Sequence, residues 1–262
     1  MARFRSSSFV WHWIIPITLL SVAYLSRDTL QAYGFYLAGF GGYTCPQDSY
    51  QARIVSYSPL IIHLENFITP KEREHLISLG LPLLEPSMVI NKNNERAQVP
   101  GRTSSSGYLP SDEPVIGCIR ERALSFQGFA SGHLLESLQV VKYQPGQSYG
   151  AHYDWGISSE DLEVTDRVTT FFAILKGDCE HCGTHFPFLK VDWCSENDQW
   201  CRLIDCDASS AINGTVFKAL EGSAIFWRNL DDAGVGDPRV LHEGMMVESG
   251  EKIGLNIWTR DG

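Results

Sequence analysis

The sequence lacks an excess of positive charge, internal repeats and low-complexity segments. Its 262 residues include 21 Lys and Arg against 31 Asp and Glu, which gives a formal net charge of −10. A nucleic-acid-binding surface needs a basic balance, so we expect no nucleic-acid partner. No block of like charge interrupts the chain either, and a hydrophobic content of 44% is that of a compact globular protein of enzyme size.

Long apolar runs are also missing, with one exception near the N-terminus. The run Phe9–Leu25 follows Arg3 and Arg5 and has about the minimum length that a spanning helix needs. His12 and Pro16 weaken its interpretation as a spanning helix. A basic flank of this kind stays in the cytosol, which would place the rest of the chain in the lumen.

A cleaved signal peptide is the competing interpretation, because Ser21-Val22-Ala23 offers the small-x-small pattern of a cleavage site. We therefore expect residues 1–28 to be a signal anchor or a signal peptide. Residues 29–51 are expected to be a glycine-rich linker, and residues 52–262 the main domain. Both alternatives send that domain into the secretory pathway, on the endoplasmic reticulum membrane or in its lumen.

Seven cysteines are present, and five of them form a cluster at Cys179, Cys182, Cys194, Cys201 and Cys206. The first pair and the last pair could bind zinc, but the spacing of the last pair is loose. An oxidising lumen favours disulfides in this cluster, without fixing their pairing. An odd number leaves at least one thiol free or intermolecular.

One glycosylation sequon agrees with a lumenal location: Asn213-Gly214-Thr215. We therefore expect a glycoprotein.

Local signals predict helices in the N-terminal half. The stretch Ala52–Leu64 is expected to be extended and broken at Pro59. A capping box at Thr69–Glu72 predicts a helix through Leu79, and a second helix is predicted to start at Ser111–Pro114. Short strands are predicted between these helices, at 88–90 and 98–103.

From about residue 137 the sequence changes to short β-runs separated by Gly, Pro and Asp. These runs span 138–143, 167–175, 215–220, 223–229 and 252–259. Strands of even size without intervening helices are typical of an antiparallel sandwich or jelly roll. We predict an α+β fold with a double-stranded β-helix core, flanking N-terminal helices and an insertion at residues 176–210.

Two histidines and one carboxylate stand out in this β-rich half. In a strand, residues i and i+2 point to the same face, so His152 and Asp154 would project into one space. His242 lies in a second extended stretch and adds another imidazole. Two histidines and a carboxylate bind Fe(II) while leaving other coordination positions open. We predict these three residues as metal ligands.

Further segments accompany the three ligands. They are Leu138–Gln147, Tyr149, Gly183–Pro187, Gly222–Trp227 and the stretch from His242 through Trp258. Together with the ligands, they resemble the prolyl 4-hydroxylase branch of the Fe(II)- and 2-oxoglutarate-dependent dioxygenases. The similarity extends from about Ile62 to the C-terminus in the same order and spacing.

The resemblance implies an oxygenase that uses Fe(II), 2-oxoglutarate, O2 and ascorbate. It assigns iron to the three predicted ligands, and it assigns the distal carboxylate of 2-oxoglutarate to Lys252. Tyr143 and Thr184 match positions that hydrogen-bond the co-substrate. A lysine in the interior of the barrel requires an anionic partner, which the co-substrate would supply.

The resemblance also implies a substrate groove, lined by Tyr149, Arg167 and Trp258. The chain departs from the family pattern nearby, because the segment between Asp154 and Arg167 is short. In addition, Cys182-Gly183-Thr184 stands where many relatives have Gly-Gly-Glu-Thr. Both departures concern the loops that contact the substrate.

Three functions are compatible with these features. We expect a prolyl 4-hydroxylase-like enzyme that acts on a proline-containing peptide or protein. The first alternative is an oxygenase that hydroxylates or desaturates a small metabolite. The second is a sugar- or peptide-binding barrel without catalysis, which a complete ligand set with Lys252 disfavours.

Overall fold

The computed structural model describes residues 43–47, 49–90, 96–128, 133–156, 167–193, 195–197 and 199–261. The chain divides into two compact units, Met1–Thr44 and Cys45–Gly262, and all the elements given below belong to the second. The signal segment expected at 1–28 and the first part of the expected linker lie outside the described residues. Within the described ranges, no helix is long and apolar enough to cross a membrane.

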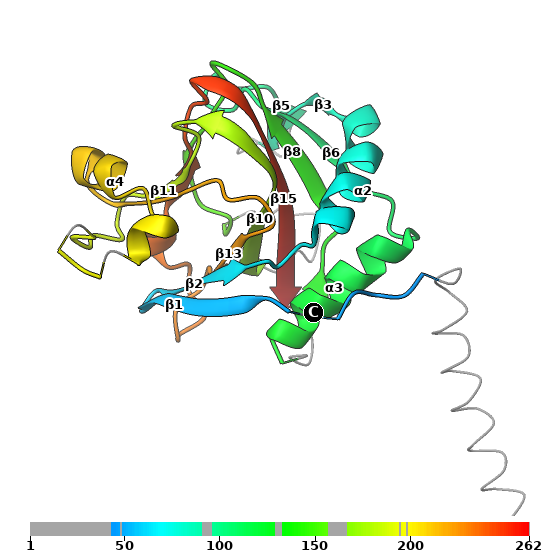
Figure 1. The fold of residues 1–262 in the computed structure, drawn as a ribbon, viewed down its shortest axis with the longest axis horizontal. Helices are drawn as coiled ribbons and strands as arrows, with labels where there is room; N and C mark the ends of the chain where they lie inside the picture. The colour runs from blue at the N-terminus through cyan, green and yellow to red at the C-terminus, as the bar shows by residue number, and fades with distance from the viewer. Residues whose placement is uncertain are drawn as a thin grey trace, which may run out of the picture. The chain divides into compact units, whose positions relative to one another are not determined.

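A nine-stranded antiparallel sheet forms the larger wall of the fold (Figure 1). Its strands, in spatial order, are β1 (Gln51–Tyr57), β2 (Leu60–Glu65), β13 (Ala224–Arg228), β10 (Arg167–Glu180), β15 (Ser249–Asp261), β8 (Gln139–Tyr143), β6 (Ser105–Tyr108) and β3 (Glu85–Pro86). The ninth strand, β7 (His133–Leu135), pairs with β15. β1 and β2 form a hairpin around Pro59, so strands from both sides of residue 137 join this sheet.

A second sheet of four strands completes the barrel. Its strands are β12 (Thr215–Phe217), β11 (Thr184–Phe186), β14 (His242–Gly244) and β9 (Tyr149–His152). Side chains from both sheets share one buried cluster, which includes Val141, Phe172, Phe186, Phe217 and Trp227. Two antiparallel sheets around a common core are the predicted double-stranded β-helix, and the fold class is confirmed.

Along the central strands of the large sheet, successive side chains point to opposite sides of the sheet. On β10, Phe171 packs in the cluster that includes helix residues, whereas Phe172 packs in the cluster between the sheets. On β15, Leu255 belongs to the helix side. Because side chains alternate along a strand, the even-numbered positions Lys252 and Trp258 face the barrel interior.

Two helices, α2 (Pro70–Gly80) and α3 (Pro114–Phe126), lie together along one side of the molecule (Figure 1). The capping box of α2 is confirmed, since the Thr69 hydroxyl accepts from the Glu72 backbone and the Glu72 carboxylate accepts from the Thr69 backbone. Arg122 of α3 donates to both Glu72 oxygens, at 2.9 and 3.0 Å. Both side chains are buried, so this ion pair fixes the two helices together.

The prediction of a strand at 98–103 is wrong. The short pair that exists joins β4 (Val89–Ile90) to β5 (Arg96–Ala97). Beyond β5, Pro100 and Gly101 form a turn, which removes the chain from the pair, and Arg102 makes an isolated bridge to Tyr149 instead.

The insertion expected at 176–210 is shorter than predicted. β10 continues to Glu180 because it pairs with β15 up to Ser249, and this long-range pairing overrides the polar local sequence. β11 follows after a turn of three residues. The remainder carries the 3-10 helix η2 (Trp200–Arg202) and helix α4 (Cys206–Ile212).

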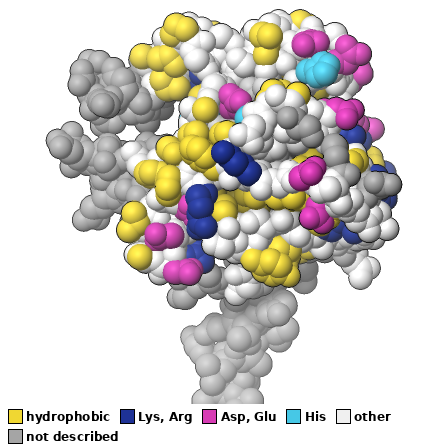
Figure 2. Space-filling view, turned by 90° about the vertical axis from the view of Figure 1, so that its left-hand side faces the viewer, with side chains coloured by type: hydrophobic (Ala, Val, Ile, Leu, Met, Phe, Trp, Pro, Cys, Tyr) yellow, Lys and Arg dark blue, Asp and Glu magenta, His cyan; other side chains and the backbone are white. Residues whose placement is uncertain are grey.

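The described cysteines of this cluster form disulfides rather than a zinc site. The described pairs are Cys179–Cys182 and Cys201–Cys206, and Cys118 on α3 pairs with Cys45. The seventh cysteine, Cys194, lies outside the described residues, so the free or intermolecular thiol expected from the odd number stays a prediction. On the face in Figure 2, Lys and Arg side chains stand among acidic and apolar ones rather than in one continuous block.

Candidate active site

His152, Asp154 and His242 meet in the four-stranded sheet. His152 is the last residue of β9, His242 is the first of β14, and the two are direct cross-strand partners. Asp154 lies just beyond β9, two residues past the histidine, and not within the strand as expected. One ligand atom from each of the three side chains lies within 4.8 Å of the others. The predicted ligand set is therefore assembled around one point.

Both histidines are held in a single orientation by backbone carbonyls. Nδ1 of His152 lies 2.9 Å from the Gly150 carbonyl oxygen, and Nδ1 of His242 lies 3.0 Å from that of Val240. A carbonyl only accepts, so each Nδ1 carries the proton and each Nε2 presents its lone pair. Each Nε2 lies 3.8 Å from an Asp154 oxygen. This arrangement suits a metal ion bound by Nε2.

Burial favours the neutral form of His152. Desolvation and the neighbouring His242 lower the pKa of His152 to about 3. A neutral imidazole is the form that binds a metal ion.

The carboxylate of Asp154 is buried and held by two hydrogen bonds. Its Oδ2 accepts from Thr170 Oγ1 at 2.8 Å and from Trp258 Nε1 at 3.1 Å. Thr170 Oγ1 in turn accepts from Asn229 Nδ2 at 2.9 Å. Burial alone would raise the pKa of Asp154, but His242, His152 and Arg167 lower it overall, so the group is a carboxylate. Thr170 and Asn229 were not predicted, because their contacts join distant strands.

Lys252 is a fully buried cation in the barrel interior. It stands opposite Tyr143 on β8, with its ammonium 4.8 Å from the centre of the Tyr143 ring. Nζ donates to the carbonyl oxygens of Cys182 and Gly183, at 2.6 and 3.2 Å. No carboxylate of the described residues contributes to its electrostatics, and burial lowers the pKa of Lys252 to about 7. An ammonium without an anion fits a site for an anionic ligand.

Tyr143 and Thr184 lie on the strands next to this ammonium. Thr184 is buried and directly follows the two residues whose carbonyls hold Lys252. Burial raises the pKa of Tyr143, so its hydroxyl stays protonated and can donate. A Cβ at Gly244 would lie 3.4 Å from that hydroxyl, so glycine lets the phenol approach the β14 backbone.

Tyr149 lies directly beside the predicted metal site. Its ring stacks on His152, with ring centres 3.6 Å apart. The guanidinium of Arg102 lies over the Tyr149 ring, 4.5 Å from its centre, and its buried Nε has no hydrogen-bond partner within the part of the chain that the structure describes. Arg102 was not among the predicted groove residues, and the structure brings it next to one of them, Tyr149.

Arg167 and Trp258 form a second cluster at Asp154. The Arg167 guanidinium lies 3.6 Å from the centre of the Trp258 ring and 3.8 Å from Asp154 Oδ1. It also donates to both oxygens of Glu136, at 2.6 and 3.0 Å, and Arg260 donates to the same carboxylate. Burial would raise the pKa of Glu136, but the two guanidiniums lower it overall. Glu136 was not predicted, since its partners are distant in sequence.

Other histidines lie outside this site. His185 pairs with Glu243 at 2.7 Å, and His75 lies 3.7 Å from Glu113. His63 is buried, and its ring stacks on Phe217 with centres 6.3 Å apart. None of these three histidines belongs to the group around His152, Asp154 and His242 among the described residues.

Comparison with known proteins places this arrangement among a group of related enzymes. No protein-family model matches the sequence. The relatives include Prolyl 4-hydroxylase 1 of Arabidopsis thaliana, 31% identical over 212 residues that cover 79% of this chain and 71% of that protein. Prolyl 4-hydroxylase 2 of the same plant is 31% identical over 211 residues, which cover 78% of this chain and 68% of that protein.

Solved structures share the fold at lower identity. The viral collagen prolyl hydroxylase vCPH from Paramecium bursaria Chlorella virus-1, in its 2OG complex, matches with a TM-score of 0.54 at 22% identity. That match covers 84% of this chain and 100% of the viral one. A prolyl hydroxylase from Trichoplax adhaerens, in complex with a hypoxia inducible factor peptide fragment, matches with a TM-score of 0.51 at 13% identity, covering 77% and 83%.

Proposed function

Because this chain belongs to the prolyl 4-hydroxylase family and is an Fe(II)- and 2-oxoglutarate-dependent dioxygenase, we propose that it hydroxylates proline within peptides or proteins. The observation that carries the proposal is a buried ammonium that has no anionic partner among the described residues, in the same barrel as a two-histidine, one-carboxylate cluster. A binding module needs neither feature. The relatives favour a peptide or protein substrate over the small-metabolite alternative.

In this proposal, the three predicted ligands hold the iron. When bound, Fe(II), O2 and 2-oxoglutarate supply the oxidising chemistry, and ascorbate keeps the metal reduced. His152 and His242 each offer an Nε2 lone pair, while their protonated Nδ1 atoms donate to backbone carbonyls. Asp154 offers an ionised carboxylate whose direction is set by Thr170 and Trp258.

Lys252, Tyr143 and Thr184 bind the co-substrate in this proposal. An ammonium has three donors, and two of those on Lys252 are directed to backbone carbonyls, so one is left for a carboxylate oxygen. The Tyr143 hydroxyl can donate to the same group. The walls around these residues are apolar and exclude water, which strengthens the charge interaction.

Tyr149, Arg167 and Trp258 are proposed to line the peptide groove. Support comes from their positions at the metal ligands, since Tyr149 stacks on His152 and Trp258 donates to Asp154. Aromatic rings at these places can pack on the apolar ring of a substrate proline. Arg167 is held by Glu136, so it can present its remaining donor edge in a fixed direction.

We also propose that the enzyme works in the lumen of the secretory pathway. The basic flank and apolar run within residues 1–28 support an anchor in the endoplasmic reticulum membrane or a cleaved signal peptide. Three disulfides agree with an oxidising compartment. Asn213, the first residue of the sequon, is exposed at the end of α4, where a glycan could be carried.

The test is turnover of the purified full-length protein with Fe(II), ascorbate and 2-oxoglutarate. We expect succinate formation to rise with a proline-rich peptide and the peptide to gain one oxygen atom on proline, as read by fragmentation mass spectrometry. A matched peptide with alanine in place of proline should give only the basal rate. Equal rates with both peptides would contradict the assignment of proline as the substrate.

A further inference from the structure

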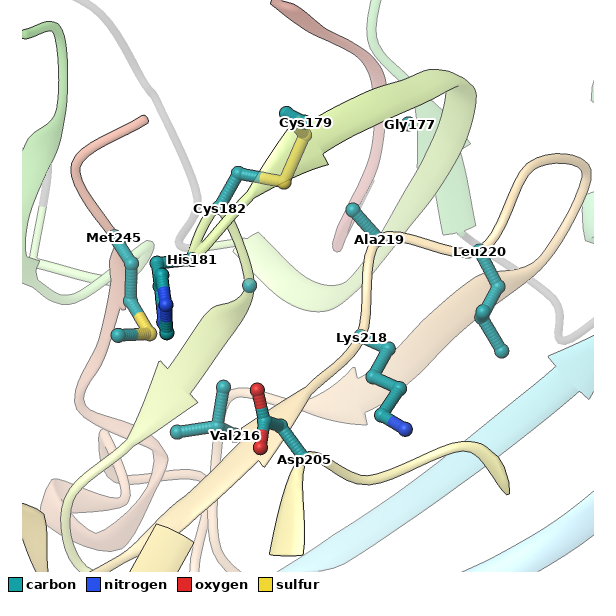
Figure 3. Close-up of a pocket in the computed structure, with 11 residues that line it drawn as sticks. Gly177, Cys179, His181, Cys182, Asp205, Val216, Lys218, Ala219, Leu220 and Met245 are labelled. Carbon is teal, nitrogen blue, oxygen red and sulfur yellow. A yellow bond between two sulfur atoms is a disulfide. The ribbon is translucent and has the colours of Figure 1, made fainter. Parts of the chain in front are cut away.

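A disulfide at the turn between β10 and β11 has no part in the oxygenase chemistry. Cys179 and Cys182 are bonded across a separation of only 3 residues. His181 stands between them in the left-handed conformation, with φ at 52°. Figure 3 shows the disulfide on one side of a pocket, with Lys218 on the segment across from it. The pocket volume is about 270 Å³, which could admit a small thiol or a side chain.

A purely structural role explains this disulfide poorly. A cross-link stabilises a fold mainly by closing a loop of the unfolded chain, so a short loop gains least. Cys45–Cys118 spans a separation of 73 residues, whereas Cys179–Cys182 spans 3. Two residues of the turn are also held without it, because Cys179 pairs with Gly250 in the sheet and the Gly183 carbonyl accepts from the Met245 backbone at 3.1 Å.

The two sulfur atoms differ in access. Cys179 is partly exposed, whereas Cys182 is only 4% exposed. Both line the pocket together with the His181 imidazole, whose side chain is 59% exposed. An incoming thiolate would therefore reach Cys179 first, and Cys182 would be the leaving group.

The same turn holds the buried cation of the active site. Lys252 Nζ donates at 2.6 Å to the carbonyl oxygen of Cys182 itself and at 3.2 Å to that of Gly183. A Cβ at Gly183 would lie 2.6 Å from Val216 Cγ1, so the backbone here is packed tightly against β12. The disulfide therefore holds Cys182, whose carbonyl is the nearer of the two acceptors, whereas Gly183 is also held by Met245 and by its packing on β12.

We propose that Cys179–Cys182 is a redox-active disulfide that exchanges with dithiols entering this pocket, and that its opening weakens 2-oxoglutarate binding through Lys252. The second half rests on the proposed role of Lys252 in holding the co-substrate. Opening the disulfide removes the side-chain tether of Cys182, so the ammonium loses the fixed position of its nearer acceptor, the Cys182 carbonyl. The enzyme would then bind its co-substrate best when its surroundings are oxidising.

The exchange balances as a two-electron transfer. One thiolate of the dithiol bonds to Cys179 Sγ, the Cys179–Cys182 bond breaks, and Cys182 leaves as a thiolate that takes up a proton. The second thiolate of the dithiol then attacks the sulfur that the dithiol contributes to the mixed disulfide. Cys179 leaves as a thiolate and takes up a proton. The dithiol ends as a cyclic disulfide and the protein as two thiols.

The first test follows the disulfide itself. Iron-loaded, full-length protein is equilibrated without oxygen in dithiothreitol buffers of graded redox ratio, and free thiols are trapped with N-ethylmaleimide and mapped by peptide mass spectrometry. We expect Cys179 and Cys182 to be labelled at ratios that leave Cys201–Cys206 closed. That second disulfide is the matched control, since it also joins nearby residues, 5 apart. If Cys179–Cys182 opens only at the ratios that also open Cys201–Cys206, the proposal is overturned.

The second test measures 2-oxoglutarate affinity by anaerobic calorimetry. The Cys179→Ser/Cys182→Ser variant, and wild-type protein with only this disulfide reduced, should bind about tenfold more weakly than the oxidised protein, the effect of about one hydrogen bond to a charged group. The Cys201→Ser/Cys206→Ser variant should bind normally. Unchanged affinity in both opened forms overturns the coupling.

Lys252→Met separates the two proposals. If it weakens binding while the opened forms bind normally, only the coupling fails. If Lys252→Met itself binds 2-oxoglutarate normally, the role of Lys252 fails, and the coupling fails with it.

Discussion

At the scale of single residues, Lys252 places opposite demands on stability and on co-substrate binding. Removing an uncompensated buried charge stabilises a fold, whereas removing the partner of a bound carboxylate weakens the ligand. We expect Lys252→Met to raise the free energy of unfolding of the ligand-free protein by about 1 to 4 kcal/mol. The same variant should bind 2-oxoglutarate at least about 100-fold more weakly. Denaturant unfolding and calorimetry measure the two effects, and a loss of both stability and affinity would contradict this account.

The lowered pKa of Lys252 also predicts a pH dependence. Burial takes the pKa from an ordinary value of 10.5 to about 7. Between these two values the unfolded chain binds more protons at this site than the folded protein, so the stability of the ligand-free protein should rise with pH. Over the same range 2-oxoglutarate binding should weaken, by about tenfold per pH unit above 7, because it requires the ammonium. Affinity titrations from pH 6 to pH 9 test this, with Lys252→Met as the pH-independent control.

Thr170 is predicted to support metal binding without touching the metal. Its hydroxyl donates to Asp154 and accepts from Asn229, so Thr170→Val removes both contacts at little change in shape. We expect iron affinity to fall about 10- to 100-fold. Thr169→Val is the matched control, because Thr169 is also buried but donates to Gln127 away from the site. Equal iron affinity in the two variants, read by chelator competition, would contradict a supporting role.

At the scale of elements, the buried ion pair between α2 and α3 is expected to be the most sensitive contact outside the site. Arg122→Met leaves the Glu72 carboxylate buried without its guanidinium partner, which should cost about 3 to 5 kcal/mol of unfolding free energy. Adding Glu72→Met should recover part of that loss, since no buried charge remains. Full recovery is not expected, because Glu72 also caps α2. A double variant less stable than Arg122→Met alone would contradict this explanation.

The elements also show which parts of the fold a sequence can predict. The start of α2 was predictable because a capping box is a local contact within four residues. The end of β10 was not, because its last residues are polar and are strands only through pairing with β15. The same division applies to the site. The histidine–aspartate pair is a local spacing and carries a family pattern, whereas Thr170, Asn229 and Glu136 reach the site only through the packing of distant strands.

At the scale of the whole molecule, the disulfide Cys45–Cys118 ties the start of the folded unit to α3. A separation of 73 residues makes it the longest of the described cross-links, and a loop of this length contributes about 4 kcal/mol by restricting the unfolded chain. We expect Cys45→Ala/Cys118→Ala to lose roughly that amount in denaturant unfolding, with 2-oxoglutarate affinity unchanged at temperatures where the variant is folded.

Cys201→Ala/Cys206→Ala provides the comparison, since it opens a much shorter loop and should lose less stability. The difference matters for the compartment in which the enzyme works. A protein that gains this much from one cross-link should accumulate when made in an oxidising lumen and be degraded faster in a reducing cytosol. Pulse-chase half-lives of the secreted and cytosolic forms measure this. Equal half-lives, together with equal unfolding energies of the two double variants, would remove the physical argument for a secretory location.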